Sequence, residues 1–86
     1  MNNHNRFQQE LDIFAHNLVW LRTHCGISKK EMAALLGIGL GSLNRLEKGE
    51  LPPRVSVNIF FAIQKQFGIS PSDQLSRPLE ESNHCT

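Results

Sequence analysis

Residues 29–48, KKEMAALLGIGLGSLNRLEK, decide the fold of this chain of 86 residues. Apolar side chains recur at helical spacing on both sides of Gly37, which predicts two short helices joined by a tight turn. Glycine adopts the left-handed backbone conformation of such a turn without strain. Ala33 is small at the place where the two helices have to cross closely. The apolar residues that we expect at this helix pair are Met32, Ala33, Leu36, Ile38, Leu43 and Leu46.

Further helices are predicted on both sides of this pair. Before it, apolar residues at steps of three and four indicate a helix over about residues 5–24. That apolar stripe consists of Phe7, Leu11, Phe14, Leu18 and Leu21. Ser28 and Glu31 have the spacing of a capping box at the start of the second helix. Gly49 ends the third helix, which we expect over about residues 40–48.

After the pair, a fourth helix is expected over about residues 55–67, and a short fifth helix follows it. Ser70 caps the fifth helix and Pro71 is its first residue. The core face of the fourth helix is expected to consist of Val57, Phe60, Ile63 and Phe67. Because no strand pattern is present in the sequence, the predicted fold class is all-α with five helices.

Charge is distributed unevenly along the chain. The formal net charge is only +1, but residues 22–54 carry six basic and three acidic side chains, and the remainder carries three basic and five acidic ones. The basic excess therefore surrounds the predicted helix pair, as expected of a surface that meets a polyanion. No apolar run reaches the roughly 18 residues of a spanning helix, so no membrane association is predicted.

Cysteine and histidine are too few or too poorly spaced for a metal or disulfide scaffold. Cys25 and Cys85 do not make a disulfide framework, which favours a reduced, cytoplasmic chain. The adjacent pairs His24–Cys25 and His84–Cys85 lack the ligand spacing of a structural zinc site. The sequence contains no nucleophile–base–acid set and no phosphate-binding loop. We therefore expect no enzyme activity, no cofactor and no metal.

Four segments together resemble one family. They are residues 14–26 (FAHNLVWLRTHCG), the helix pair itself, residues 45–49 (RLEKG) and residues 67–70 (FGIS). As a set of spaced positions they resemble the helix-turn-helix domain of the phage repressor and Cro proteins, the Xre or Cro/C1-type family. The resemblance covers residues 14–75. Residues 1–13 are then an N-terminal extension of the first helix, and residues 76–86 a tail that we expect to be disordered.

The resemblance implies that the third helix enters the major groove of double-stranded operator DNA. Asparagine can pair with adenine there, arginine with guanine, and an apolar side chain can touch a thymine methyl group. The two lysines at the start of the second helix are expected at a phosphate, although a purely solvated pair is the alternative. The candidate DNA-binding residues are Lys29, Lys30, Gly39, Leu40, Gly41, Ser42, Asn44, Arg45, Lys48 and Arg54.

Two features of the resemblance concern structure rather than contact with DNA. Arg22 and Glu47 resemble a pair of opposite charges that ties the first helix to the end of the third. Gly39 and Gly41 stand where the family usually carries polar or bulkier residues. These glycines either let the third helix approach DNA closely or weaken base readout, and the sequence alone leaves both interpretations open.

The predicted function is a sequence-specific, DNA-binding transcriptional regulator. The alternative is a protein-interaction module on the same fold, such as an antitoxin-like component or an adaptor, whose partner is a protein. The clustered basic residues favour the regulator, and the two glycines together with the low net charge favour the module.

The resemblance also implies a two-fold homodimer. Ile13 and Trp20 are seven residues apart and share a helix face, with Val19 beside them. These three residues are expected either to form an isologous dimer patch or to pack on the fifth helix of the same chain.

Overall fold

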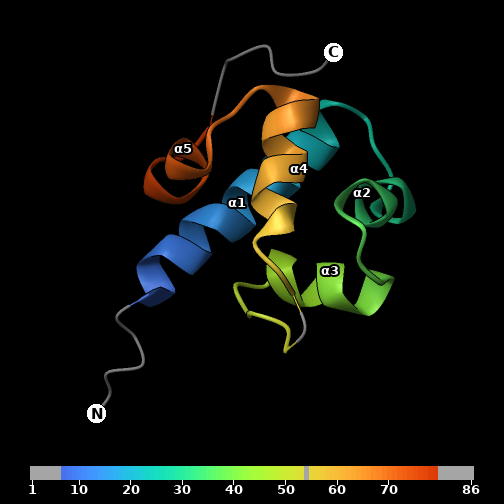
Figure 1. The fold of residues 1–86 in the computed structure, drawn as a ribbon, viewed down its shortest axis with the longest axis horizontal. Helices are drawn as coiled ribbons and strands as arrows, with labels where there is room; N and C mark the ends of the chain where they lie inside the picture. Colours follow the sequence, from blue (N-terminus) through green and yellow to red (C-terminus); the bar gives the residue numbers. More distant parts are fainter. Residues whose placement is uncertain (1–6, 54, 80–86) are drawn as a thin grey trace.

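The computed structural model describes residues 7–53 and 55–79, and it contains five helices and no strand within these ranges. The helices are α1 (Gln8–His24), α2 (Lys29–Leu36), α3 (Leu40–Glu47), α4 (Asn58–Phe67) and α5 (Pro71–Ser76). In Figure 1, α4 lies at the centre of the view, with α2 to its right and α5 to its left. Each helix packs against two others, so that α1, α3, α2, α4 and α5 form a closed ring of neighbours. The predicted all-α, five-helix fold is confirmed.

Local side-chain chemistry sets the ends of α2 as expected. Ser28 Oγ accepts a hydrogen bond from the Glu31 backbone N–H at 3.1 Å, and the Ser28 N–H donates to Glu31 Oε1 at 2.9 Å. This capping box satisfies two backbone donors that α2 itself cannot pair. At the other end Gly37 has φ 70°, the left-handed conformation that the turn into α3 requires.

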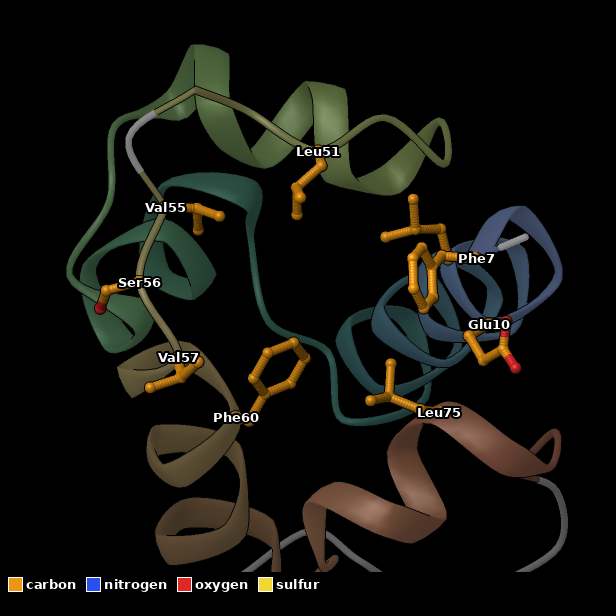
Figure 2. A pocket seen from close by; sticks show the side chains of 9 residues that line it. Phe7, Glu10, Leu51, Val55, Ser56, Val57, Phe60 and Leu75 are labelled. Atoms are coloured by element: carbon orange, nitrogen blue, oxygen red, sulfur yellow. The ribbon is translucent and has the colours of Figure 1, made fainter. Parts of the chain in front are cut away.

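Two residues expected in the core from their helical spacing are exposed instead. α4 begins at Asn58, so Val57 precedes the helix and is 65% exposed. Ile59, Ile63 and Phe67 are the buried residues of α4, because a four-residue step keeps them on one face once the helix starts there. Phe7 precedes α1 and is 67% exposed. Figure 2 shows both Val57 and Phe7 beside an open groove.

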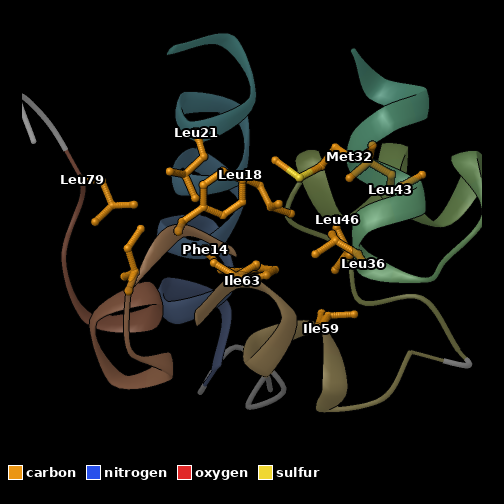
Figure 3. Close-up of a cluster of buried hydrophobic side chains, with 13 residues drawn as sticks. Phe14, Leu18, Leu21, Met32, Leu36, Leu43, Leu46, Ile59, Ile63 and Leu79 are labelled. Atoms are coloured by element: carbon orange, nitrogen blue, oxygen red, sulfur yellow. The ribbon is translucent and has the colours of Figure 1, made fainter. Parts of the chain in front are cut away.

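The hydrophobic core lies inside the ring of helices (Figure 3). Every expected side chain of the α2–α3 pair is buried except Ile38, which is half-buried against the core. The Phe60 ring meets the Phe14 ring edge-on, with 5.1 Å between the ring centroids. The buried core residues are Phe14, Leu18, Leu21, Met32, Ala33, Leu36, Leu43, Leu46, Ile59, Ile63, Phe67, Ile69 and Leu79.

Part of the segment expected to be disordered belongs to the core. Leu79 is 6% exposed, and its backbone N–H donates to Asn17 Oδ1 at 2.8 Å. Asn17 Nδ2 in turn donates to the carbonyl oxygens of Gln74 at 2.9 Å and Arg77 at 3.0 Å. A buried asparagine on α1 thereby holds residues 77–79 against the helix. The rest of the expected tail, residues 80–86, lies outside the described residues.

The structure also bears on the cysteine and membrane expectations. Cys25 is disulfide-bonded, which corrects the expectation of a fully reduced chain, and Cys85 and His84 lie outside the described residues. A bridge requires two Cα atoms within roughly 4.4–6.8 Å of each other and Cβ atoms that face one another, and separation along the chain determines neither. No helix in the described ranges is long and apolar enough to cross a membrane.

Candidate nucleic-acid interface

α3 has one buried and one open face. Leu43 and Leu46 are 0% and 1% exposed, because they pack into the core beneath the helix. Leu40 is 48% exposed, and Arg45 and Lys48 are also exposed. A short helix whose apolar side is fully covered presents its other side as a rigid ridge, which is the form that enters a major groove.

The start of α2 adjoins this ridge. Lys29 and Lys30 are the first two residues of α2, and both are exposed. The first backbone N–H groups of an α-helix have no acceptor inside the helix, and the helix dipole favours an anion at this end. Two ammonium groups beside these N–H groups suit a phosphate oxygen of a nucleic-acid backbone.

Lys29 is linked to the middle of α3. Lys29 Nζ donates a hydrogen bond to Asn44 Oδ1 at 3.1 Å and lies 4.0 Å from Glu47 Oε1. The bond engages the acceptor end of the Asn44 amide and leaves its two N–H donors for another partner. An amide that presents donors suits the acceptors O6 and N7 of guanine or O4 of thymine better than the bidentate pairing with adenine.

Arg22 and Glu47 form an ion pair, as the family resemblance implies. Arg22 Nε donates to Glu47 Oε2 at 2.7 Å, and Arg22 Nη2 donates to Glu47 Oε1 at 3.3 Å. The side chains are 17% and 8% exposed, so water screens the pair little. Two parallel bonds fix the angle between α1 and the end of α3, so the guanidinium holds the ridge in place.

A second link between α1 and the end of α3 was not anticipated from the sequence. Gln8 Nε2 donates to the Gly49 carbonyl oxygen at 3.1 Å and to Asp12 Oδ1 at 2.8 Å. Gly49 has φ 83°, and a Cβ atom there would lie 2.7 Å from Asp12 Oδ1. The glycine therefore allows the chain to turn closely against α1. The position of Gly49 after the third helix could be recognised in the sequence. Its contacts with Gln8 and Asp12 of α1 could not.

The two unusual glycines lie at the start of α3. Gly39 is the N-cap residue, with φ −77° and ψ 162°, and Gly41 is in the first turn. Both are exposed, and a Cβ atom at either position would meet no atom within 4 Å. Neither packing nor backbone conformation therefore requires glycine here. Their effect is to leave the backbone at the start of the ridge uncovered.

The remaining candidates occupy less open positions or are not described. Ser42 is half-buried on α3, and Arg54 lies outside the described residues. The structure thus brings the start of α2 together with the exposed side of α3. Within the described residues, no group of three or more histidine, cysteine or acidic side chains is arranged to hold a metal ion.

Comparison with known families identifies the domain type. A family model described as helix-turn-helix, of the Cro/C1 and Xre-like type, matches residues 18–74, which extend from the middle of α1 into α5. Domains of this family are typically non-catalytic. No curated protein and no solved structure matches the chain significantly.

Proposed function

Because the chain belongs to the Cro/C1-type helix-turn-helix family and so to a family of DNA-binding domains, we propose that it is a sequence-specific transcriptional regulator that reads operator DNA with α3. Such a regulator acts in the compartment that holds the DNA, which for a prokaryotic or phage protein is the cytoplasm.

The observation that carries the proposal is the two-sided character of α3. Leu43 and Leu46 on its apolar side are at most 1% exposed. Arg45 and Lys48 are exposed on the open side. Two more exposed cations, Lys29 and Lys30, stand at the adjoining start of α2. This arrangement supplies phosphate contacts beside base-reading side chains. In DNA recognition, phosphate contacts position the protein and base contacts select the sequence.

Each side chain has a role in the proposed complex. Arg45 donates to the O6 and N7 atoms of a guanine, and Asn44 donates its two amide hydrogens to a neighbouring base edge. Leu40 touches a thymine methyl group. Lys29, Lys30 and Lys48 neutralise phosphates, and Ser42 lies near the backbone. The uncovered backbone at Gly39 and Gly41 allows the start of α3 to approach the DNA closely.

A second candidate function has its own supporting observation. Large apolar side chains remain exposed outside the set of proposed DNA contacts, notably Phe7, Leu51 and Val57. Such residues favour a protein contact, and the first turn of α3 offers no side chain at Gly41. A protein-interaction module on the same fold would bind its partner through the exposed apolar side chains. It would not need a side chain at Gly41.

Selection of bound sites from a random pool of duplex DNA separates the two functions. The regulator is expected to enrich one sequence, and its affinity should fall steeply between two salt concentrations because bound phosphates release counterions. No enriched sequence, together with no salt-dependent binding, would leave the interaction module as the function.

Variants at Arg45 then test the role of α3. Arg45→Ala is expected to weaken binding to the enriched sequence by about 1–3 kcal/mol and to relax base choice at one position. Lys65→Ala removes the same charge from α4 and is the matched control, because Lys65 lies on a different helix. Equal losses on the enriched sequence and on random DNA would show that Arg45 contacts only phosphate. Fluorescence anisotropy measures both affinities.

A further inference from the structure

The carboxylate on α3 has both of its oxygen atoms engaged inside the chain. Glu47 Oε2 accepts a hydrogen bond from Arg22 Nε at 2.7 Å, and Glu47 Oε1 accepts one from Arg22 Nη2 at 3.3 Å. The Glu47 side chain is only 8% exposed. This strong acceptor is therefore not available to a hydrogen-bond donor that approaches α3 from solvent.

The amide oxygen of Asn44 is engaged as well. Lys29 Nζ donates to Asn44 Oδ1 at 3.1 Å and lies 4.0 Å from Glu47 Oε1. An ammonium group has donors and no acceptor, so it meets the oxygen of the amide and not the nitrogen. Asn44 thereby keeps its two N–H donors for a partner outside the chain.

The other positions of α3 and its C-cap add donors or no polar side chain at all. Arg45 and Lys48 are exposed cations without an acceptor. Leu40 is apolar and 48% exposed. Gly39 has no side chain that could cap the first backbone N–H groups of α3, which have no acceptor within the helix. The half-buried hydroxyl of Ser42 can accept, but it can equally donate.

Base edges in the major groove differ in the same property. Guanine presents two acceptors, O6 and N7, and thymine presents the acceptor O4 beside a methyl group. Adenine N6 and cytosine N4 are amino groups, which require an acceptor on the protein. A surface of donors and one apolar side chain therefore matches guanine and thymine and leaves amino groups without a partner.

We propose that α3 reads its operator through keto bases alone, with guanine at Arg45 and guanine or thymine at Asn44. The amino groups of adenine and cytosine are then left without a contact. This specificity rests on the proposed function and deepens it, because it names the class of base edge that the regulator recognises. Lys29 is a positioning residue here, since its ammonium group makes Asn44 a donor.

Base analogues that lack single atoms test the proposal on the DNA. The probe is the duplex enriched by site selection, and the position at which Asn44→Ala relaxes base choice identifies the base pair that Asn44 reads. Removal of the amino group there, by purine for adenine or 2-pyrimidinone for cytosine, should change the affinity by about twofold or less. Removal of an acceptor, by 7-deazaguanine for guanine or 5-methyl-2-pyrimidinone for thymine, should weaken binding roughly tenfold.

Asn44→Asp tests the same point on the protein. The substitution keeps the shape of the side chain but replaces the two amide donors by a carboxylate oxygen, which only accepts. Site selection should then invert one base pair relative to the rest of the site, because the carboxylate requires an amino base where Asn44 met a keto base. Selection at low salt offsets the added negative charge, since low salt strengthens the phosphate contacts.

Asn58→Asp is the matched control. It makes the same chemical change at the exposed first residue of α4, so it should select the wild-type sequence. Thermal melting followed by circular dichroism verifies that the Asn44 and Asn58 variants are folded.

The outcomes separate this specificity from the proposed function. The keto-base specificity alone is overturned if amino-group removal weakens wild-type binding roughly tenfold, or if Asn44→Ala relaxes no position. It is also overturned if folded Asn44→Asp selects the wild-type sequence, or if Asn58→Asp inverts the same base pair. A wild type that enriches no sequence would count against the regulator itself, and the specificity would fall with it.

Discussion

At the scale of single residues, glycine has opposite meanings at two positions four residues apart. Gly37 has φ 70°, a conformation in which an L side chain is strained whatever space surrounds it. Gly41 lies in ordinary helical backbone with open space where a Cβ atom would be. The first glycine is therefore required by the turn, and the second costs α3 stability.

Substitution at these two glycines should shift thermal stability in opposite directions. Gly37→Val places a β-branched residue in the left-handed region, at a cost of about 1–3 kcal/mol, so Tm should fall by roughly 5–15 °C. Gly41→Ala gains up to about 1 kcal/mol of helix propensity, so Tm should stay unchanged or rise. Calorimetry of both variants gives the two shifts. An unchanged Tm for Gly37→Val would mean that the turn tolerates other conformations.

At the scale of helices, α2 and α3 act as one unit because apolar contacts connect their buried sides and a polar bond connects their exposed sides. Lys29 on α2 donates to Asn44 and lies near Glu47, both on α3. Glu47 is held in turn by Arg22 of α1. The first residue of α2 thereby influences which hydrogen-bonding atoms the middle of α3 leaves without a partner in the chain.

This link predicts different outcomes for two adjacent lysines. Lys29→Met removes a cation and also releases Asn44 Oδ1, so overall affinity should fall and adenine should become acceptable at one position. Lys30→Met removes a cation alone and should weaken binding to all sequences alike. The slope of log affinity against log salt concentration should fall in magnitude by about one. Repeating the site selection with each variant measures the base preference. Identical selected sequences for the two variants would show that Lys29 serves only as a phosphate contact.

At the scale of the whole molecule, the ring of helices is closed by polar as well as apolar contacts. Asn17, which is 2% exposed, bonds to Gln74, Arg77 and Leu79 from the middle of α1. Gln74, 1% exposed, donates to the carbonyl oxygens of Phe60 and Ile69. These two amides join α1, α4 and α5 with residues 77–79.

Removal of the Asn17 amide should loosen this closure. Asn17→Ala leaves three buried or part-buried backbone groups without their partner, and a loss of about 2–4 kcal/mol in the free energy of unfolding is expected. Asn58→Ala is the control, since Asn58 is exposed at the start of α4 and should change stability by about 0.5 kcal/mol or less. Urea unfolding of both variants provides the comparison. A loss for Asn17→Ala no larger than the control's would mean that the chain does not need this closure.

The sequence by itself determined the features that neighbouring residues decide. The capping box at Ser28, the turn at Gly37 and the burial of Leu43 and Leu46 depend on spacings of three or four residues. The same short-range patterns carried the family resemblance, which the match over residues 18–74 confirms. The contacts of the candidate residues with DNA remain predictions, because a pattern indicates where a side chain points and not what it meets.

Only the tertiary structure decided the features that join distant parts of the chain. Asn17 reads as a polar residue on a helix, and its bonds to residues 57, 60 and 62 positions further on could not be read from its neighbours. Val57 and Phe7 fit helical stripes by spacing, yet they are exposed because no helix in residues 7–53 and 55–79 covers those ends of α4 and α1. Burial depends on which helices meet in space, and periodicity specifies only which face is apolar.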